Sequence, residues 1–279
     1  MIPRVLGALV RAILVVVMIV TPSLLFPGTA VDVMPVVTRV ALLAAGLTFF
    51  EYASIYPGLV EFRDAPPFNR IRFGSLFLTV ILLTELVIGT TTPTALSQFV
   101  SGIGATVGEA IDFPYSPVRL VVLMLPEDAD PRHIQLVRDS AGLAYIISLI
   151  TLAVFVIFQR LRQWPIRNGG FNVWVNLPTF DPTAGGDVVE RLERDARFNI
   201  ALGFLLPFLT PAVIKSATSL FGTVSLDNPQ TLIWTVAAWA FLPASLFMRG
   251  IAMGRIALLI TEKRKLALQD QGNTGLVPV

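Results

Sequence analysis

The chain has 279 residues, of which 54% are hydrophobic and 14% charged, and its formal net charge is +2. A mean hydropathy of +0.72 exceeds that of an ordinary soluble domain, so the composition predicts a membrane protein. The lack of cysteine excludes disulfides, thiolate metal sites and iron–sulfur clusters, and the single histidine, His133, excludes sites that need two imidazoles.

Six stretches are candidates for membrane-spanning helices, since a helix needs about 20 mostly apolar residues to cross a hydrocarbon core about 30 Å thick. In chain order they cover residues 5–26, 34–56, 71–92, 140–158, 198–220 and 230–251. The first could instead be a signal peptide, because small residues follow it at 27–30. Its length and the closely following second span favour a retained helix. The sequence therefore predicts an all-α polytopic bundle over residues 1–260.

The basic residues of the connections fall mainly on one side of these spans. That side carries Arg4, Arg63, Arg70, Arg72, Arg160, Arg162, Arg167, Arg191, Arg194, Arg197, Lys263, Arg264 and Lys265. Cytoplasmic loops are enriched in Lys and Arg, so both termini are predicted to be cytoplasmic. With no evident organelle-targeting segment, we expect a bacterial inner membrane.

The outer connection, residues 93–139, is too long for a simple turn. Its apolar residues recur at helical spacing, which predicts an amphipathic helix: Leu96, Phe99, Val100, Ile103, Val107 and Ile111. Gly104-x-x-x-Gly108 is a spacing that allows close helix packing, but a flexible glycine-rich amphipathic segment is the favoured interpretation. Residues 118–125 could form a strand or an interfacial segment. Asp130 before Pro131 is typical of a helix start, so the fourth span should begin outside the membrane.

The inner connection, residues 159–197, is expected to be partly structured. Apolar and polar residues alternate over 171–177 after an Asn-Gly-Gly turn signal, which predicts a short strand or hairpin, and 187–197 reads as a charged helix. A segment of this size cannot bury its own core, so the bundle or a partner should order it. The tail, residues 261–279, is expected to be disordered.

Charged residues within the spans are the candidate sites, because an ionised group in a bilayer needs a partner, a water-lined cavity or access to the interface. Counted from the proposed span ends, Arg39, Glu85 and Lys215 share one depth near the outer side and could form a network. Glu51 and Arg249 share a depth near the inner side and could form a second pair. Glu85 would either carry a proton or cation, or hold helices together with the two cations; the second interpretation is favoured.

Prolines interrupt the last two spans at positions 207, 211 and 243. Each leaves a backbone carbonyl without its helical donor, and such a carbonyl could face an ion. Simple kinks, with Thr210 and Ser245 nearby to pair the freed groups, are the favoured alternative.

No motif for catalysis, ATP hydrolysis or calcium binding occurs in the sequence. We therefore predict a non-enzymatic membrane protein without cofactor, metal or nucleic acid. An accessory, assembly or scaffold subunit that packs against another membrane protein, or against copies of itself within the lipid bilayer, is the favoured function. The alternative is a small secondary transporter or channel that uses Glu85 and Lys215.

Overall fold

The structure is a computed structural model that describes residues 2–26, 33–162, 164–165, 171–181, 183, 185–221 and 226–273. Its helices are α1 (Ile2–Leu25), α2 (Val33–Ala53), α3 (Phe68–Ile88), α4 (Ala95–Ile111), α5 (Pro117–Val122), α6 (Pro131–Leu161), α7 (Val173–Asn176), α8 (Val188–Phe221) and α9 (Pro229–Asn273). Six of them, α1, α2, α3, α6, α8 and α9, are long and apolar enough to cross a membrane. The predicted all-helical fold with six candidate spans is thus confirmed. The possible signal-peptide site at 27–30 lies outside the described residues.

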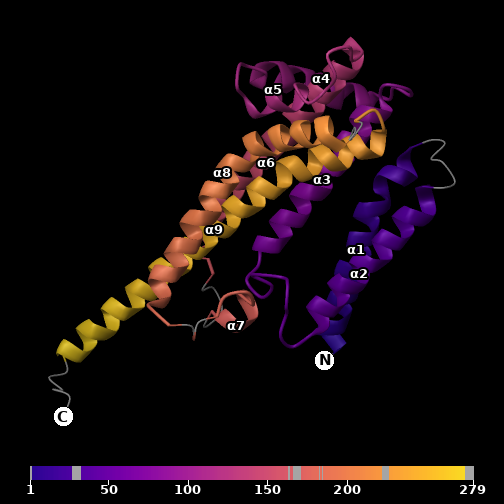
Figure 1. Cartoon of the computed structure of the whole chain (residues 1–279). Coiled ribbons are helices and arrows are strands. Elements are labelled where there is room, and N and C mark those ends of the chain that lie inside the picture. The colour runs from indigo at the N-terminus through magenta and orange to yellow at the C-terminus, as the bar shows by residue number, and fades with distance from the viewer. Residues whose placement is uncertain are drawn as a thin grey trace.

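The helices form two groups that stand side by side (Figure 1). One is a hairpin of α1 and α2, and the other is a bundle of α3, α6, α8 and α9 whose upper end in this view is covered by α4 and α5. Among the described helices, α2 contacts only α1, whereas α1 also contacts α3 and α9. The hairpin therefore meets the bundle along a narrow contact.

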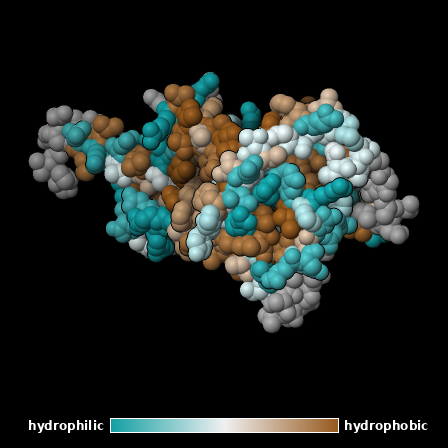
Figure 2. Space-filling model, turned by 90° about the horizontal axis from the view of Figure 1, so that it is seen from above, coloured by the Kyte–Doolittle hydropathy of each residue, from teal (hydrophilic) through white to brown (hydrophobic). Residues whose placement is uncertain are grey.

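The sides of the molecule are apolar, as lipid-facing helices should be. Leu43 and Phe50 of α2 are 68% and 71% exposed. Viewed onto the end that carries α4 and α5, the surface shows broad hydrophobic areas between hydrophilic patches (Figure 2). Such areas would be unstable in water, so the surface agrees with a protein embedded in a bilayer.

The bundle has one apolar core at each end. Beneath α4 and α5, the buried side chains include Val80, Leu83, Val118, Val137 and Ile233. At the other end a second core contains Phe62, Phe68, Phe155, Trp164, Met248 and Met253. The indole Nε1 of Trp164 donates to the backbone carbonyl of Ala65 (3.1 Å). The loop before α3 and Trp164 after α6 are therefore held by the bundle.

The predicted outer helix is present as α4, and the start of the fourth span is also confirmed. Asp130 is the N-cap of α6, where its Oδ1 accepts the backbone N–H of Arg132 (2.8 Å). Residues 117–122, for which strand and interfacial segment were both open, form the short helix α5.

The predicted strand within residues 171–177 is wrong, because Val173–Asn176 form the short helix α7. Asn176 bonds to the loop before α3 in place of a neighbouring strand: its backbone oxygen accepts the N–H of Phe62 (2.6 Å), and its side-chain Oδ1 accepts that of Asp64 (3.0 Å). An isolated two-stranded hairpin has little stability of its own, so these contacts decide the conformation. The turn expected at 168–170 lies outside the described residues.

The predicted disordered tail is helical as far as Asn273, where α9 ends. Residues 262–269 are mostly good helix formers, which explains the continuation. Arg264 also forms an ion pair with Asp187, just before α8 (2.9 Å). The pKa of Asp187 is lowered because its carboxylate accepts the backbone N–H of Val189 and a hydrogen bond from Arg264.

The two glycines of the Gly104-x-x-x-Gly108 motif lie where α4 packs against α6. A Cβ placed on Gly142 of α6 would lie 2.5 Å from the Cα of Gly108 and 2.8 Å from its backbone nitrogen. Only glycine fits at such a distance, so the motif serves close packing here and not flexibility.

Replacing Gly142 by alanine should therefore separate α4 from α6 and lower the free energy of unfolding by about 1–3 kcal/mol. Gly102 of α4, around which a Cβ would meet no atom within 4 Å, is the matched control. Gly102→Ala should be neutral or slightly stabilising, because alanine favours helix. Thermal unfolding of the detergent-purified variants measures both, and equal midpoints would contradict the close packing.

Candidate functional site

A cleft of about 1230 Å³ separates the α1–α2 hairpin from the bundle. Its walls are apolar over most of their length: Leu6, Val10 and Leu14 of α1 face the cleft, as do Phe73 of α3 and Leu242 and Leu246 of α9. Polar residues gather at the end near the beginning of α1 and α3. Its volume is somewhat above the roughly 300–1,000 Å³ of typical small-molecule sites. The cleft is thus lined mainly by apolar side chains, and its polar residues lie within about one helical turn of Leu14, Phe73 and Leu242.

The loop after α2 fixes the polar end of the cleft. The carboxylate of Glu51 accepts the backbone N–H groups of Gly58, Leu59 and Val60 (3.0–3.1 Å). The loop also bonds back to the end of α2, because the side chain of Arg63 donates to the backbone carbonyls of Glu51 (2.9 Å) and Ser54 (2.8 Å). The carbonyls at the end of a helix lack helical partners, so Arg63 satisfies groups that the membrane interface would leave exposed.

The hairpin is attached to the bundle at its other end as well. Gln230 at the start of α9 donates from Nε2 to Oγ of Ser23 on α1 (2.8 Å). Phe26, just after α1, packs against the core beneath α4 and α5. With both ends fixed in this way, the middle of the hairpin stands away from the bundle, and this separation forms the cleft.

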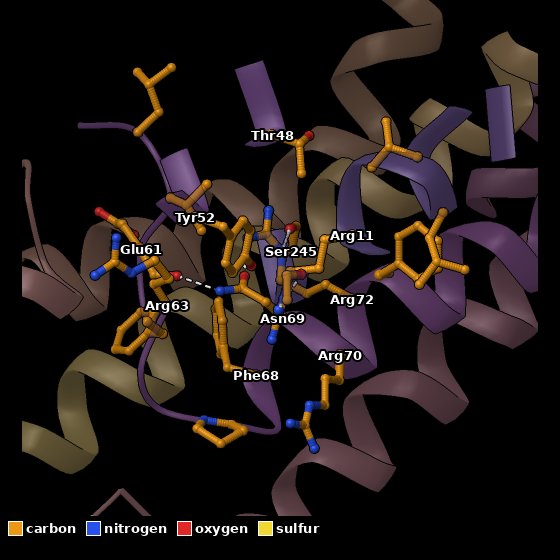
Figure 3. A pocket seen from close by; sticks show the side chains of 18 of the residues that line it. Arg11, Thr48, Tyr52, Glu61, Arg63, Phe68, Asn69, Arg70, Arg72 and Ser245 are labelled. Carbon is orange, nitrogen blue, oxygen red and sulfur yellow. Dashed lines mark hydrogen bonds between the residues drawn. The ribbon is translucent and has the colours of Figure 1, made fainter. Parts of the chain in front are cut away.

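Arg72 of α3 lies at the polar end of the cleft (Figure 3). Its Nε donates to Oγ of Ser245 on α9 (2.6 Å), and its Nη1 makes a long hydrogen bond to Oδ1 of Asn69 (3.4 Å). The rings of Phe68 and Phe241 lie 5.4 and 5.7 Å from its guanidinium carbon, within the range of cation–π interactions. Contacts with α3 and α9 thus position the side chain, and part of its charge faces the cleft.

The single carboxylate of the cleft lining, Glu61, is already engaged. It forms a two-bonded ion pair with Arg249 of α9 (2.6 and 2.9 Å) and accepts a hydrogen bond from Thr179 (2.7 Å). Its backbone carbonyl also accepts a hydrogen bond from Nδ2 of Asn69 (2.7 Å). This pair joins the loop before α3 to α9 and the segment after α7.

Positive charge dominates the polar end. The lining contains five arginines and one glutamate: Arg11, Arg63, Arg70, Arg72, Arg249 and Glu61. Arg63 and Arg249 have acidic partners. Among the described residues, Arg11, Arg70 and Arg72 form no ion pair. Figure 3 shows Arg70 pointing away from the group around Arg72, whereas Arg11 lies over the ring of Tyr52 (4.6 Å).

The predicted outer network is not joined by any bond among the described residues. Lys215 donates from Nζ to the backbone carbonyl of Leu123 (2.6 Å), which ends α5. Glu85 is half-buried and Arg39 is exposed, and neither makes a hydrogen bond or ion pair with a described residue. Arg39 belongs to the hairpin, and α2 packs on α1 and not on α3. Equal depth along separate helices did not bring these three residues together.

The predicted inner pair has different partners from those expected. Arg249 pairs with Glu61, and Glu51 binds the backbone of the loop that follows it. Sequence reasoning missed Glu61 because it lies in a connection, and it assigned Arg72 to membrane orientation alone. The Pro57-Gly58 turn was an available signal, since it folds the chain back towards Glu51.

One of the carbonyls freed by the prolines has a partner within the bundle. Pro211 has no N–H, so the carbonyl of Pro207 loses its helical donor. Nε1 of Trp239 on α9 donates to that carbonyl (3.1 Å). At this position a neighbouring helix satisfies the carbonyl, as the kink interpretation requires, although the donor is a tryptophan and not Ser or Thr.

Comparison of the chain with known protein families, with curated proteins and with solved structures found no match. Within the described residues, no group of three or more His, Asp or Glu side chains could hold a metal ion. The cleft and its charges are therefore the features that bear on function.

Replacing Glu61 by alanine should leave Arg249 without its acidic partner in a mostly buried position. Removing one member of such a pair costs about 3 kcal/mol of folding free energy. Glu193→Ala is the matched control, because Glu193 pairs with Arg197 on the exposed side of α8, 3.6 Å away. That pair should contribute less than about 0.5 kcal/mol. Similar thermal midpoints for the two variants would show that Glu61 does not fix the polar end of the cleft.

Proposed function

We propose that this chain is a non-enzymatic, multi-pass membrane protein that holds an amphiphilic molecule of the bilayer in the cleft between the α1–α2 hairpin and the bundle. The cleft itself carries the proposal: it combines apolar walls with a group of polar residues, and both ends of the hairpin are fixed so that the space stays open. An amphiphile has the same division into an apolar body and a polar head.

Binding fits the residues of the cleft better than a reaction does. Arginine stays protonated in proteins and offers hydrogen-bond donors only, so it is suited to holding an anion and not to exchanging protons. The carboxylate of Glu61 is engaged by Arg249 and Thr179. The groups that remain free to meet a ligand are donors and apolar surfaces.

We further propose that the polar end of the cleft faces the cytoplasmic leaflet of a bacterial inner membrane, with both termini inside. The excess of Lys and Arg in the connections on that side supports this orientation. The accessory, assembly or scaffold role expected from the sequence fits such a site, because a held lipid can form part of the surface offered to a membrane-protein partner or to a second copy of the chain.

Filling the cleft should expel its occupant. Val10 lines the cleft and is 50% exposed, while Val5 on the same helix is 46% exposed and lies outside the lining. Val10→Trp places an indole inside the cleft, so it should lower the amount of co-purifying lipid by more than half. Val5→Trp, facing the surrounding bilayer, should retain the wild-type amount. Native mass spectrometry in mild detergent measures the bound lipid, and equal retention by both variants would refute the proposal.

A further inference from the structure

Arg72 carries a charge that no described side chain neutralises by an ion pair. A guanidinium has five N–H donors, and two of the hydrogen bonds of Arg72 go to the neutral oxygens of Ser245 and Asn69. The charge of Glu61 acts on Arg72 from a distance, but both of its carboxylate oxygens are bound by Arg249 and form no hydrogen bond with Arg72. A partly buried cation next to apolar walls is costly unless an anion meets it.

A second cation reaches the same end of the cleft from the opposite helix group. Arg11 of α1 lies over the ring of Tyr52 and donates from Nη1 to the carbonyl of Gly7 (2.7 Å). Its other donors have no described partner. Arg11, Tyr52 and Arg72 all line the cleft, and Figure 3 shows them at the same end of it.

The depth of this region matches that of a lipid headgroup. Ser245 and Arg249 lie roughly 24 and 30 Å along α9 from its first residue, Pro229, at about 1.5 Å per residue. With Pro229 at one boundary of a hydrocarbon core about 30 Å thick, Ser245 and Arg249 would lie near the other boundary, where lipid headgroups begin. Leu14 and Leu242, which line the cleft further from this boundary, lie where acyl chains would be.

We infer that the held amphiphile carries a phosphate headgroup that Arg72 and Arg11 bind from opposite sides of the cleft. This inference rests on the function proposed above and names the chemistry of its ligand. A phosphate offers three or more acceptor oxygens in different directions, and guanidinium groups match it with pairs of hydrogen bonds. A carboxylate has only two oxygens in one plane, which suits donors arriving from a single side.

The test titrates the full chain in detergent with dioctanoyl phosphatidic acid and with dioctanoylglycerol, which has the same chains but no phosphate. Native mass spectrometry reports the bound fraction of each. Arg72→Gln should weaken binding of the phosphatidic acid about tenfold or more, towards the affinity for dioctanoylglycerol, and leave the latter unchanged. Arg160→Gln, an exposed site on α6 outside the cleft lining, should bind both lipids as the wild type does.

Arg11→Gln serves as the second variant, because it removes the other cation without touching the bundle. It should also lower the affinity for the phosphatidic acid and spare dioctanoylglycerol, so it decides the question if Arg72→Gln fails to fold. Inorganic phosphate should compete only weakly, since it lacks the acyl chains. Competition as strong as that of the lipid would overturn the assignment to a lipid phosphate.

The two proposals can fail separately in this experiment. If both arginine variants bind the two lipids as the wild type does while Val10→Trp loses both, the cleft holds an amphiphile but the phosphate inference is wrong. If Val10→Trp also keeps both lipids, they bind elsewhere and both proposals are wrong.

Discussion

The reciprocal bonds between the end of α2 and the loop after it fix the end of the hairpin at which the cleft lies. The carboxylate of Glu51 holds the N–H groups of Gly58, Leu59 and Val60, and Arg63 holds the carbonyls that end α2. These bonds satisfy backbone groups of the turn and of the end of α2, so they hold the loop in one conformation. The loop sets how far the hairpin stands from α3, and that separation is the cleft.

The charges at the polar end follow from the same arrangement. The loop places Glu61 against Arg249, and their ion pair connects the loop with α9. Because this one carboxylate is engaged, Arg72 and Arg11 keep donors for a further anion. In the proposed binding mode, Arg249 serves structural pairing and Arg72 and Arg11 serve ligand binding, so a bound anion would balance the cationic excess at this end.

The sequence was sufficient for the long apolar helices, but not for α7, the helical tail or the neighbours of each helix. Hydropathy predicted the six long apolar helices, helical spacing predicted α4, and Asp130 before Pro131 predicted the start of α6. Counting residues gave Glu51 and Arg249 a common depth, but depth does not say which way a side chain faces or which helix lies beside it. Glu61 lies in a connection whose position depends on tertiary contacts, so no periodic pattern could reveal it.

The central claim is that the fixed hairpin leaves a space that a lipid occupies. A cryo-electron microscopy structure in nanodiscs of phosphatidic acid and phosphatidylcholine tests it most directly. The account predicts elongated density between α1 and α9, with its head beside Arg72 and its tail along Leu14 and Leu242. A hairpin packed directly against α3 and α9, with the cleft closed and no lipid density, would contradict it.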